Sequence, residues 1–262
     1  MKHLNLTLAL LIICAAPGAA WGAPHGGDRP DPESPEFPAY VLDRVDDMYR
    51  GAQSKGRMEM TIQTKHWKRT LEMDSWSKGQ DYSLVRILKP RKERGTSTLK
   101  AKKDLFIYLN KTGRTVKITS GMMGGSWMGS HMTNDDLVRQ SRMARDFVMK
   151  LTFKGQEGGV AVYRFTLQAK PDAATAWDKL VVTVRQSDLQ PLSQEYWDED
   201  GKKVRVLTFS DYQKVGDSLR PMVMLMKPTD KPDEYTQIKM KKLDFSVKLD
   251  PSFFSLQKLK SL

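Results

Sequence analysis

The side chains that most often carry enzyme or metal chemistry are scarce in this sequence. It contains four histidines, His3, His25, His66 and His131, and a single cysteine, Cys14. None of the histidines belongs to an HExxH pair or has a second ligand at metal-binding spacing. A lone cysteine cannot form an intramolecular disulfide or a cysteine-based zinc or iron–sulfur site. We therefore expect neither a cofactor nor a bound metal.

A glycine-rich stretch at 121–129 matches two functional motifs only in part. Residues 124–128 read GGSWM, with methionine where the nucleophile elbow of a hydrolase needs glycine. The stretch also lacks the Gly-Lys-Ser/Thr ending of a phosphate-binding loop. The acidic run at 198–200 is better explained as a solvated hairpin end than as a catalytic carboxylate pair. We predict that the chain is not an enzyme and keep catalysis as a first alternative.

Methionine is unusually frequent, with 15 in the chain. Some alternate along a predicted strand, as in 58–60 (MEM) and 222–226 (MVMLM), a spacing that could present thioethers to Cu(I). Periplasmic Cu(I) binding is therefore a second alternative, although a buried strand has the same period of two. Unbranched thioether side chains also adapt to a variable apolar guest such as an acyl chain. This last interpretation makes the methionines candidates for a ligand cavity.

The N-terminus has the order of a secretory signal peptide. Lys2 precedes a mostly apolar run at 4–16, which is too short to span a bilayer, and small residues follow. We predict a signal peptide at 1–22, with cleavage after Gly22 and export to the periplasm. A lipoprotein signal at Cys14 and an uncleaved anchor stay open, although Ile13 stands where a lipoprotein signal needs a small residue.

Charge and composition restrict the partners. The net charge of the chain is +12, and cleavage of the signal would remove one lysine and leave +11. A basic surface favours anionic partners, among them an anionic membrane surface. We expect no nucleic-acid partner, because the sequence lacks helix-turn-helix, RNP and zinc-finger patterns. The hydrophobic fraction of 39% is sufficient for a packed core.

The hydrophobic pattern predicts one mainly β domain. Residues 23–39 contain five prolines and indicate a flexible leader, and a single domain is expected over 40–262. An N-terminal helix comes first, because apolar residues from Val41 onward repeat at helical spacing. Apolar residues then alternate in many short runs separated by turn signals. We predict about a dozen strands in a curved antiparallel sheet that forms an unclosed (half) β-barrel.

A loop and a short helix interrupt the strands at 120–142 and are expected to act as a lid. Thr133 can cap a helix that starts at Asn134, with acidic residues in its first turn. A curved sheet that helices cover incompletely can hold one apolar ligand. The candidate residues of the cavity and lid are Met58, Met60, Ile62, Leu71, Met73, Met122, Met123, Trp127, Met128, Met132 and Leu137.

Several segments resemble the periplasmic outer-membrane lipoprotein-sorting protein family, relatives of the LolA and LolB carriers. The most specific are the turn at 90–95 (PRKERG), the tripeptide at 108–110 (YLN) and the stretch at 127–136 (WMGSHMTNDD). The resemblance extends from about Tyr40 to the last predicted strand. It implies an unclosed antiparallel barrel with a helical lid that carries a lipid or an acylated protein without catalysis. His131 stands where the family more often has an acidic residue, and no functional position is transferred from the classical carriers.

The residues and the resemblance lead to the same functional expectation. Each methylene of an acyl chain exposed to water costs about 0.8 kcal/mol, so transfer between membranes needs a shielded apolar cavity. We predict a periplasmic carrier for a lipid or a lipoprotein acyl chain, and the family suggests an inner-membrane transporter as a candidate donor. A non-catalytic envelope module that binds only another protein is the third alternative.

Overall fold

The computed structural model describes residues 29–48, 50–139, 143–173 and 175–261. The signal peptide predicted at 1–22 lies outside these residues. Helix α1 (Phe37–Asp47) is the first regular element described, and it begins within the range predicted as the leader. The division into signal peptide, leader and domain stays a prediction.

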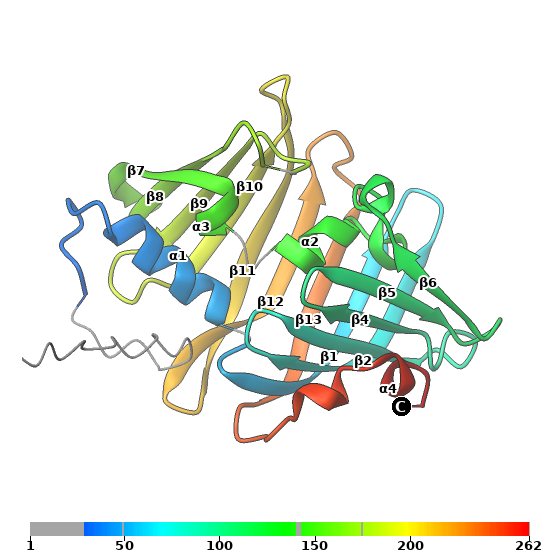
Figure 1. Ribbon diagram of the computed structural model, residues 1–262. Helices are drawn as coiled ribbons and strands as arrows, with labels where there is room; N and C mark the ends of the chain where they lie inside the picture. The colour runs from blue at the N-terminus through cyan, green and yellow to red at the C-terminus, as the bar shows by residue number, and fades with distance from the viewer. Residues whose placement is uncertain (1–28, 49, 140–142, 174, 262) are drawn as a thin grey trace, which may run out of the picture.

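Within the described residues, thirteen strands form one antiparallel sheet (Figure 1). Along the sheet their order is β6-β5-β4-β3-β2-β1-β13-β12-β11-β10-β9-β8-β7. This confirms the predicted unclosed antiparallel sheet. The strands are β1 (Gln53–Gln63), β2 (Lys68–Lys78), β3 (Tyr82–Lys89), β4 (Ser97–Ala101), β5 (Asp104–Leu109), β6 (Arg114–Ile118), β7 (Phe147–Glu157), β8 (Val160–Ala169), β9 (Lys179–Arg185), β10 (Pro191–Trp197), β11 (Lys203–Val215), β12 (Ser218–Pro228) and β13 (Tyr235–Asp244).

The strand order explains why a segment crosses the sheet. Strands β1 to β6 form one meander and β7 to β13 a second, and the pairing of β1 with β13 joins them. The two free edges, β6 and β7, are therefore consecutive in the chain. The chain between them has to pass from one edge of the sheet to the other. The short helices α2 (Asn134–Arg139) and α3 (Met143–Asp146) lie in this connection, in front of the sheet (Figure 1).

The two faces of the sheet differ as the period of two requires. On β1, Met58, Met60 and Ile62 are buried, and the residues between them point to the other face. Around Arg57 that outer face is polar, and Arg57 Nε donates to Asp74 Oδ1 at 2.8 Å across the β1–β2 pair. The apolar inner face is the one that α1 and the β6–β7 connection cover.

Helix α1 closes the inner face over the second meander. Phe37, Val41 and Leu42 lie on one side of the helix and are at most 2% exposed. They join a core with side chains of β8 to β10, in which the Phe37 ring meets the Tyr163 ring edge-on at a centroid distance of 5.0 Å. This half of the sheet therefore has a conventional aromatic core.

The C-terminal segment adds a smaller core that the strand pattern does not predict. The turn η3 (Pro251–Phe253) and helix α4 (Leu256–Ser261) follow β13, and α4 contacts β4. Phe254 and Leu259 pack there against Leu84 and Leu99. Across the described parts of the chain, no helix combines the length and apolar character needed to cross a membrane.

Candidate ligand-binding site

The covering of the first meander is the lid segment, which we define as residues 119–139. It contains two single turns, η1 (Ser120–Met122) and η2 (Trp127–Gly129), and then α2. The Asp136 N–H donates to Thr133 Oγ1 at 3.2 Å, and the Thr133 N–H donates back to Asp136 Oδ2 at 2.7 Å. This reciprocal cap confirms the predicted helix start at Asn134.

A tight turn directs Trp127 toward the sheet. Met128 and Gly129 both have positive φ, at 53° and 70°, and the Ser130 N–H returns to the Trp127 carbonyl at 2.9 Å. Trp127 is 2% exposed, and its Nε1 donates to Thr98 Oγ1 on β4 at 3.1 Å. The indole is therefore both packed and hydrogen-bonded, as a buried tryptophan requires.

Beneath the lid segment lies the methionine cluster, which unites nine of the eleven predicted site residues. Its buried members are Met58, Met60, Ile62, Leu71, Met73, Ile87, Trp127 and Ile238, and the half-buried side chains packed against them include Met128, Met132, Leu137, Met224 and Met240. Strand pairing sets the geometry, since Met58 lies opposite Met73 on β2 and opposite Met240 on β13. With Ile87 on β3 and Met224 on β12, the cluster spans five adjacent strands and the lid segment.

The other two predicted residues lie elsewhere. The side chain of Met122 is 41% exposed at the surface of the lid segment. Met123 packs against Leu105 and Ile118, a small cluster near the β6 edge. Leu137 contacts both this cluster and the methionine cluster, so it joins the two.

In the structure the methionine cluster is covered. Met60, Ile62, Leu71 and Met73 are fully buried, and Trp127 belongs to the same contact cluster. The lid segment therefore lies between these side chains and solvent. Three sets of polar contacts fasten the lid segment to the sheet.

The strongest of these contacts is a buried ion pair between Asp136 and Arg205 of β11. Arg205 Nη2 donates to both carboxylate oxygens at 2.6 and 2.7 Å, and the two side chains are only 5% and 7% exposed. The guanidinium lies between the rings of Trp177 and Tyr196, at 4.4 and 4.1 Å from their centroids. Burial and the nearby Asp136 raise the pKa of Tyr196 above its ordinary value, so this phenol stays neutral.

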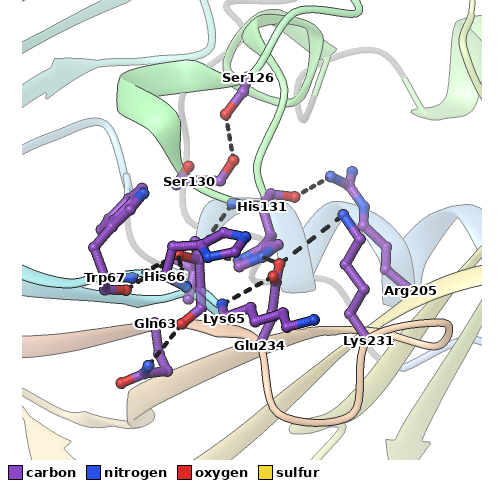
Figure 2. A network of polar contacts seen from close by, with 12 residues as sticks. Gln63, Lys65, His66, Trp67, Ser126, Ser130, His131, Arg205, Lys231 and Glu234 are labelled. Atoms are coloured by element: carbon purple, nitrogen blue, oxygen red, sulfur yellow. Dashed lines mark hydrogen bonds and ion pairs between the residues drawn. The ribbon is translucent and has the colours of Figure 1, made fainter.

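A second contact set holds His131 at the turn between β12 and β13 (Figure 2). His131 Nε2 lies 3.1 Å from Glu234 Oε2, and Nδ1 lies 2.9 Å from Thr236 Oγ1. Glu234 also accepts the backbone N–H of Lys65 at 3.1 Å. These two hydrogen bonds lower the pKa of Glu234, with the bond from His131 the larger cause. The carboxylate thus connects the lid segment to the β1–β2 turn.

Arg69 makes a third contact between the sheet and the lid segment. Its Nη2 donates to the Met128 carbonyl, and its Nη1 pairs with Glu93 Oε2 at 3.2 Å. Sequence reasoning missed Arg69, Arg205 and Glu234 because their partners in the lid segment are 59 to 103 residues away along the chain. No local pattern signals such pairs.

The alternating methionines lie on the buried face of the sheet. Among the residues that the structure describes, no three His, Cys, Asp or Glu side chains are grouped so that they could hold a metal ion. The MEM and MVMLM methionines point to the inner face, where Met58, Met60, Met222 and Met226 are at least nine-tenths buried. They lie among carbon side chains of the core, as a strand with one buried face requires.

Solved structures with this architecture are known. A domain described as an outer membrane lipoprotein-sorting protein domain from Vibrio parahaemolyticus has a TM-score of 0.75 at 22% identity, covering 87% of this chain and all of its own. A DUF1329 family protein from Desulfovibrio piger reaches 0.77 at 22% identity, over 88% and 100% of the two chains. A LolA superfamily protein from Nitrosomonas europaea reaches 0.72 at 17% identity, over 84% and 98%. No curated protein sequence matches the chain significantly.

A family model described as "Uncharacterized protein"-like matches residues 79–261, which is more than half of the chain. The chain belongs to that family, and its fold is LolA-like. The resemblance to outer-membrane lipoprotein-sorting proteins is thereby confirmed for the fold.

Within the LolA-like fold, the segments that carry the resemblance lie together. Asn110 Nδ2 donates to the Arg94 carbonyl at 2.9 Å, which joins the 108–110 and 90–95 segments. Gly95 has a φ of +87°, and a Cβ there would stand 2.8 Å from Asn110 Nδ2. Arg69 then links the 90–95 turn to the lid segment through Glu93 and Met128. The motifs thus support the lid at its attachment to the sheet.

Proposed function

We propose that this protein is a non-catalytic periplasmic carrier that shields the acyl chain of a lipid or lipoprotein between the lid segment and the methionine cluster. The observation that carries the proposal is a LolA-like sheet whose methionine-rich inner face is closed by a loop rather than by a long helix. The outer-membrane lipoprotein-sorting domain with the same fold supports the choice of cargo.

The chemistry of the cluster suits a flexible apolar guest. Methionine side chains have three rotatable bonds and adapt to irregular shapes. Met58, Met60 and Met73 supply such side chains from two adjacent strands, and Met128 and Met132 supply them from the lid segment. In the closed state Trp127 takes the place that the acyl chain would occupy. Loading therefore exchanges the indole for the cargo.

The test compares two methionines of the lid segment. Met128 is half-buried against the cluster and has a φ of 53°, a conformation that aspartate tolerates better than most residues. We expect Met128→Asp to lose most of the lipid that co-purifies with the exported wild-type protein. Met122→Asp is the matched control, because Met122 is exposed and lies outside the cluster.

Native mass spectrometry and lipid extraction provide the readout. A wild-type protein free of lipid, which also fails to bind a fluorescent fatty acid, contradicts the proposal and favours the protein-interaction module. Equal retention in both variants shows that the lid segment does not contact the cargo. Tight retention of Cu(I) by the purified chain supports the metal alternative instead.

A further inference from the structure

Positive charge is concentrated at one end of the first meander. Three turns with their flanking residues, 64–69, 89–95 and 109–114, contain nine lysines and arginines but only one acidic residue. Their combined charge of +8 accounts for most of the net charge of +12. We call these three segments the basic rim. Its cations are Lys65, Lys68, Arg69, Lys89, Arg91, Lys92, Arg94, Lys111 and Arg114.

The three turns form one surface. Alternate turns of a meander fall at the same end of a sheet, and side-chain contacts join them here. Arg69 Nη1 pairs with Glu93 across the first two turns, and Asn110 Nδ2 donates to the Arg94 carbonyl across the second and third. The single acidic side chain of the rim is thus neutralised within it. Most of the cations are exposed to solvent.

The neighbouring turns at the same end carry the opposite charge. The β12–β13 turn at 229–234 and the β10–β11 turn at 198–202 each have a net charge of −2. If the positive charge were spread evenly over the surface, adjacent hairpins would not differ in the sign of their charge. The basic rim is therefore a localised electrostatic surface with one orientation toward a partner.

An exposed tryptophan lies within the basic rim. The Trp67 side chain is 42% exposed at the β1–β2 turn, between Lys65 and Lys68. The Arg69 guanidinium lies 5.3 Å from the centroid of its ring. Tryptophan is enriched at the headgroup level of bilayers, where its ring is half apolar and half wet. Lysine and arginine near an anionic leaflet add about 1 kcal/mol each.

We propose that the basic rim docks on an anionic phospholipid surface, with Trp67 inserted among the headgroups. A bilayer fits better than a folded acidic protein because the exposed cations are spread over three hairpin tips beside an exposed indole, where separate headgroups can each meet a cation. The shared chemistry is charge attraction to phosphodiester headgroups together with interfacial burial of an aromatic ring.

The docking surface is coupled to the lid segment. Arg69 donates to the Met128 carbonyl. Figure 2 shows a second link, in which the Lys65 N–H donates to Glu234, the carboxylate that contacts His131. A membrane bound at the β1–β2 turn therefore adjoins the end of the lid segment. This role in transfer rests on the proposed carrier function, whereas docking itself does not.

The experiment measures co-sedimentation with vesicles of phosphatidylglycerol and phosphatidylcholine, and with phosphatidylcholine alone. We expect binding only to the anionic vesicles and weakening as salt rises. Arg91→Gln combined with Lys92→Gln should weaken binding roughly 20- to 30-fold. The matched control, Lys102→Gln with Lys103→Gln, removes the same charge from the exposed β4–β5 turn and should leave binding within about twofold of wild type.

A second variant tests the aromatic part of the proposal. Trp67→Ala should weaken vesicle binding, and brominated lipids should quench less of the total tryptophan fluorescence than in wild type. Equal losses in both double variants show a non-specific charge effect and overturn the proposal. Preference for heparin or an acidic polypeptide without vesicle binding overturns it as well.

The two proposals fail in different ways. If the protein binds anionic vesicles but carries no acyl cargo, the docking proposal stands and the carrier proposal is contradicted. If the protein retains lipid but does not bind anionic vesicles, only the docking proposal is contradicted.

Discussion

Helix α1 and the lid segment cover the same face of one sheet but in different ways. Over the helix-covered half, β7 to β11, an eleven-residue helix packs Phe37 against an aromatic core that includes Tyr163 and Phe165. Over the lid-covered half, β1 to β4 with β13, a loop closes on methionines. The first half has the rigid packing of a permanent core, and the second has side chains that can rearrange.

The lid segment also depends more on polar side-chain contacts than α1 does, since α1 is held mainly by its apolar side chains. The contacts that hold the lid segment include those of Arg205, Arg69 and Glu234, which are distant from it in the sequence. Each is made by one side chain, whereas α1 is held by a continuous apolar side of the helix. The comparison teaches that one continuous sheet can carry two kinds of covering on the same face, a helix over an aromatic core and a loop over a methionine-rich cluster.

The largest expected effect is in the helix-covered half. Phe37→Ala removes a fully buried ring from α1 and should lower the free energy of unfolding by about 3–5 kcal/mol. Urea unfolding measures the loss, and Leu109→Ala, at a 40% exposed side chain, should stay within about 0.5 kcal/mol of wild type. Folded Phe37→Ala should retain lipid as wild type does. Selective loss of lipid in this variant would remove the distinction between the two halves.

The next largest effect is a dependence of stability on pH, which should differ between the two halves of the sheet. Burial raises the pKa of Asp46 on α1 to about 7; Asp43 and Asp47 add to the increase, and Arg50 and Lys100 oppose it. Because the native state favours protonated Asp46, its contribution to stability is present at acid pH and is lost as pH rises through 7. Wild type should lose up to roughly 4 kcal/mol relative to Asp46→Asn between pH 4 and pH 8.

The lid segment should respond in the opposite sense. The pKa of Glu234 is lowered by His131, so this contact stabilises the native state above the ordinary glutamate pKa and is lost in acid. Hydrogen exchange resolved by segment distinguishes the two responses. Residues 37–47 should exchange faster at alkaline pH and 126–137 at acid pH, relative to the intrinsic rates. Parallel changes in both segments would contradict independent coverings.

A smaller effect is expected at the tryptophan of the lid segment. Thr98→Val keeps the shape of the side chain but removes the acceptor of the Trp127 Nε1 hydrogen bond, which leaves a buried donor unpaired. The substitution should destabilise the conformation in which Trp127 is buried by about 1–3 kcal/mol. Faster exchange at 126–137 and faster release of a fluorescent fatty acid are the expected results. Unchanged release would show that Trp127 does not move when the ligand leaves.

The sequence predicts the elements that cover the sheet better than it predicts the side-chain contacts that attach them to it. The period of two along β1 and the Thr133 cap depend on neighbouring residues, and both are found as expected. The inner-face methionines follow from the same alternation, since every second residue of a half-buried strand faces the core. Local pattern is therefore sufficient for the sheet, the lid helix and most of the candidate cluster.

The contacts between the lid segment and the sheet depend on the order of the strands. Arg205 meets Asp136 only because β11 lies near the centre of the sheet, below the connection from β6 to β7. Nothing near Arg205 in the sequence distinguishes it from a solvated arginine. Helix α4 is missed for a similar reason, since a six-residue helix depends on packing against β4 rather than on its own pattern.

The smallest change in stability should give the clearest functional contrast. Met60 and Met226 are both buried methionines, 0% and 1% exposed, but Met60 belongs to the methionine cluster and Met226 to the core under α1. Leucine has nearly the volume of methionine, so Met60→Leu and Met226→Leu should each cost less than about 1.5 kcal/mol. A branched side chain adapts less to a guest, however. Met60→Leu should therefore narrow the range of acyl lengths that co-purify, measured by lipid mass spectrometry, and Met226→Leu should leave it unchanged. If both variants narrow the range equally, the cargo extends under α1 as well, and the site occupies the whole inner face.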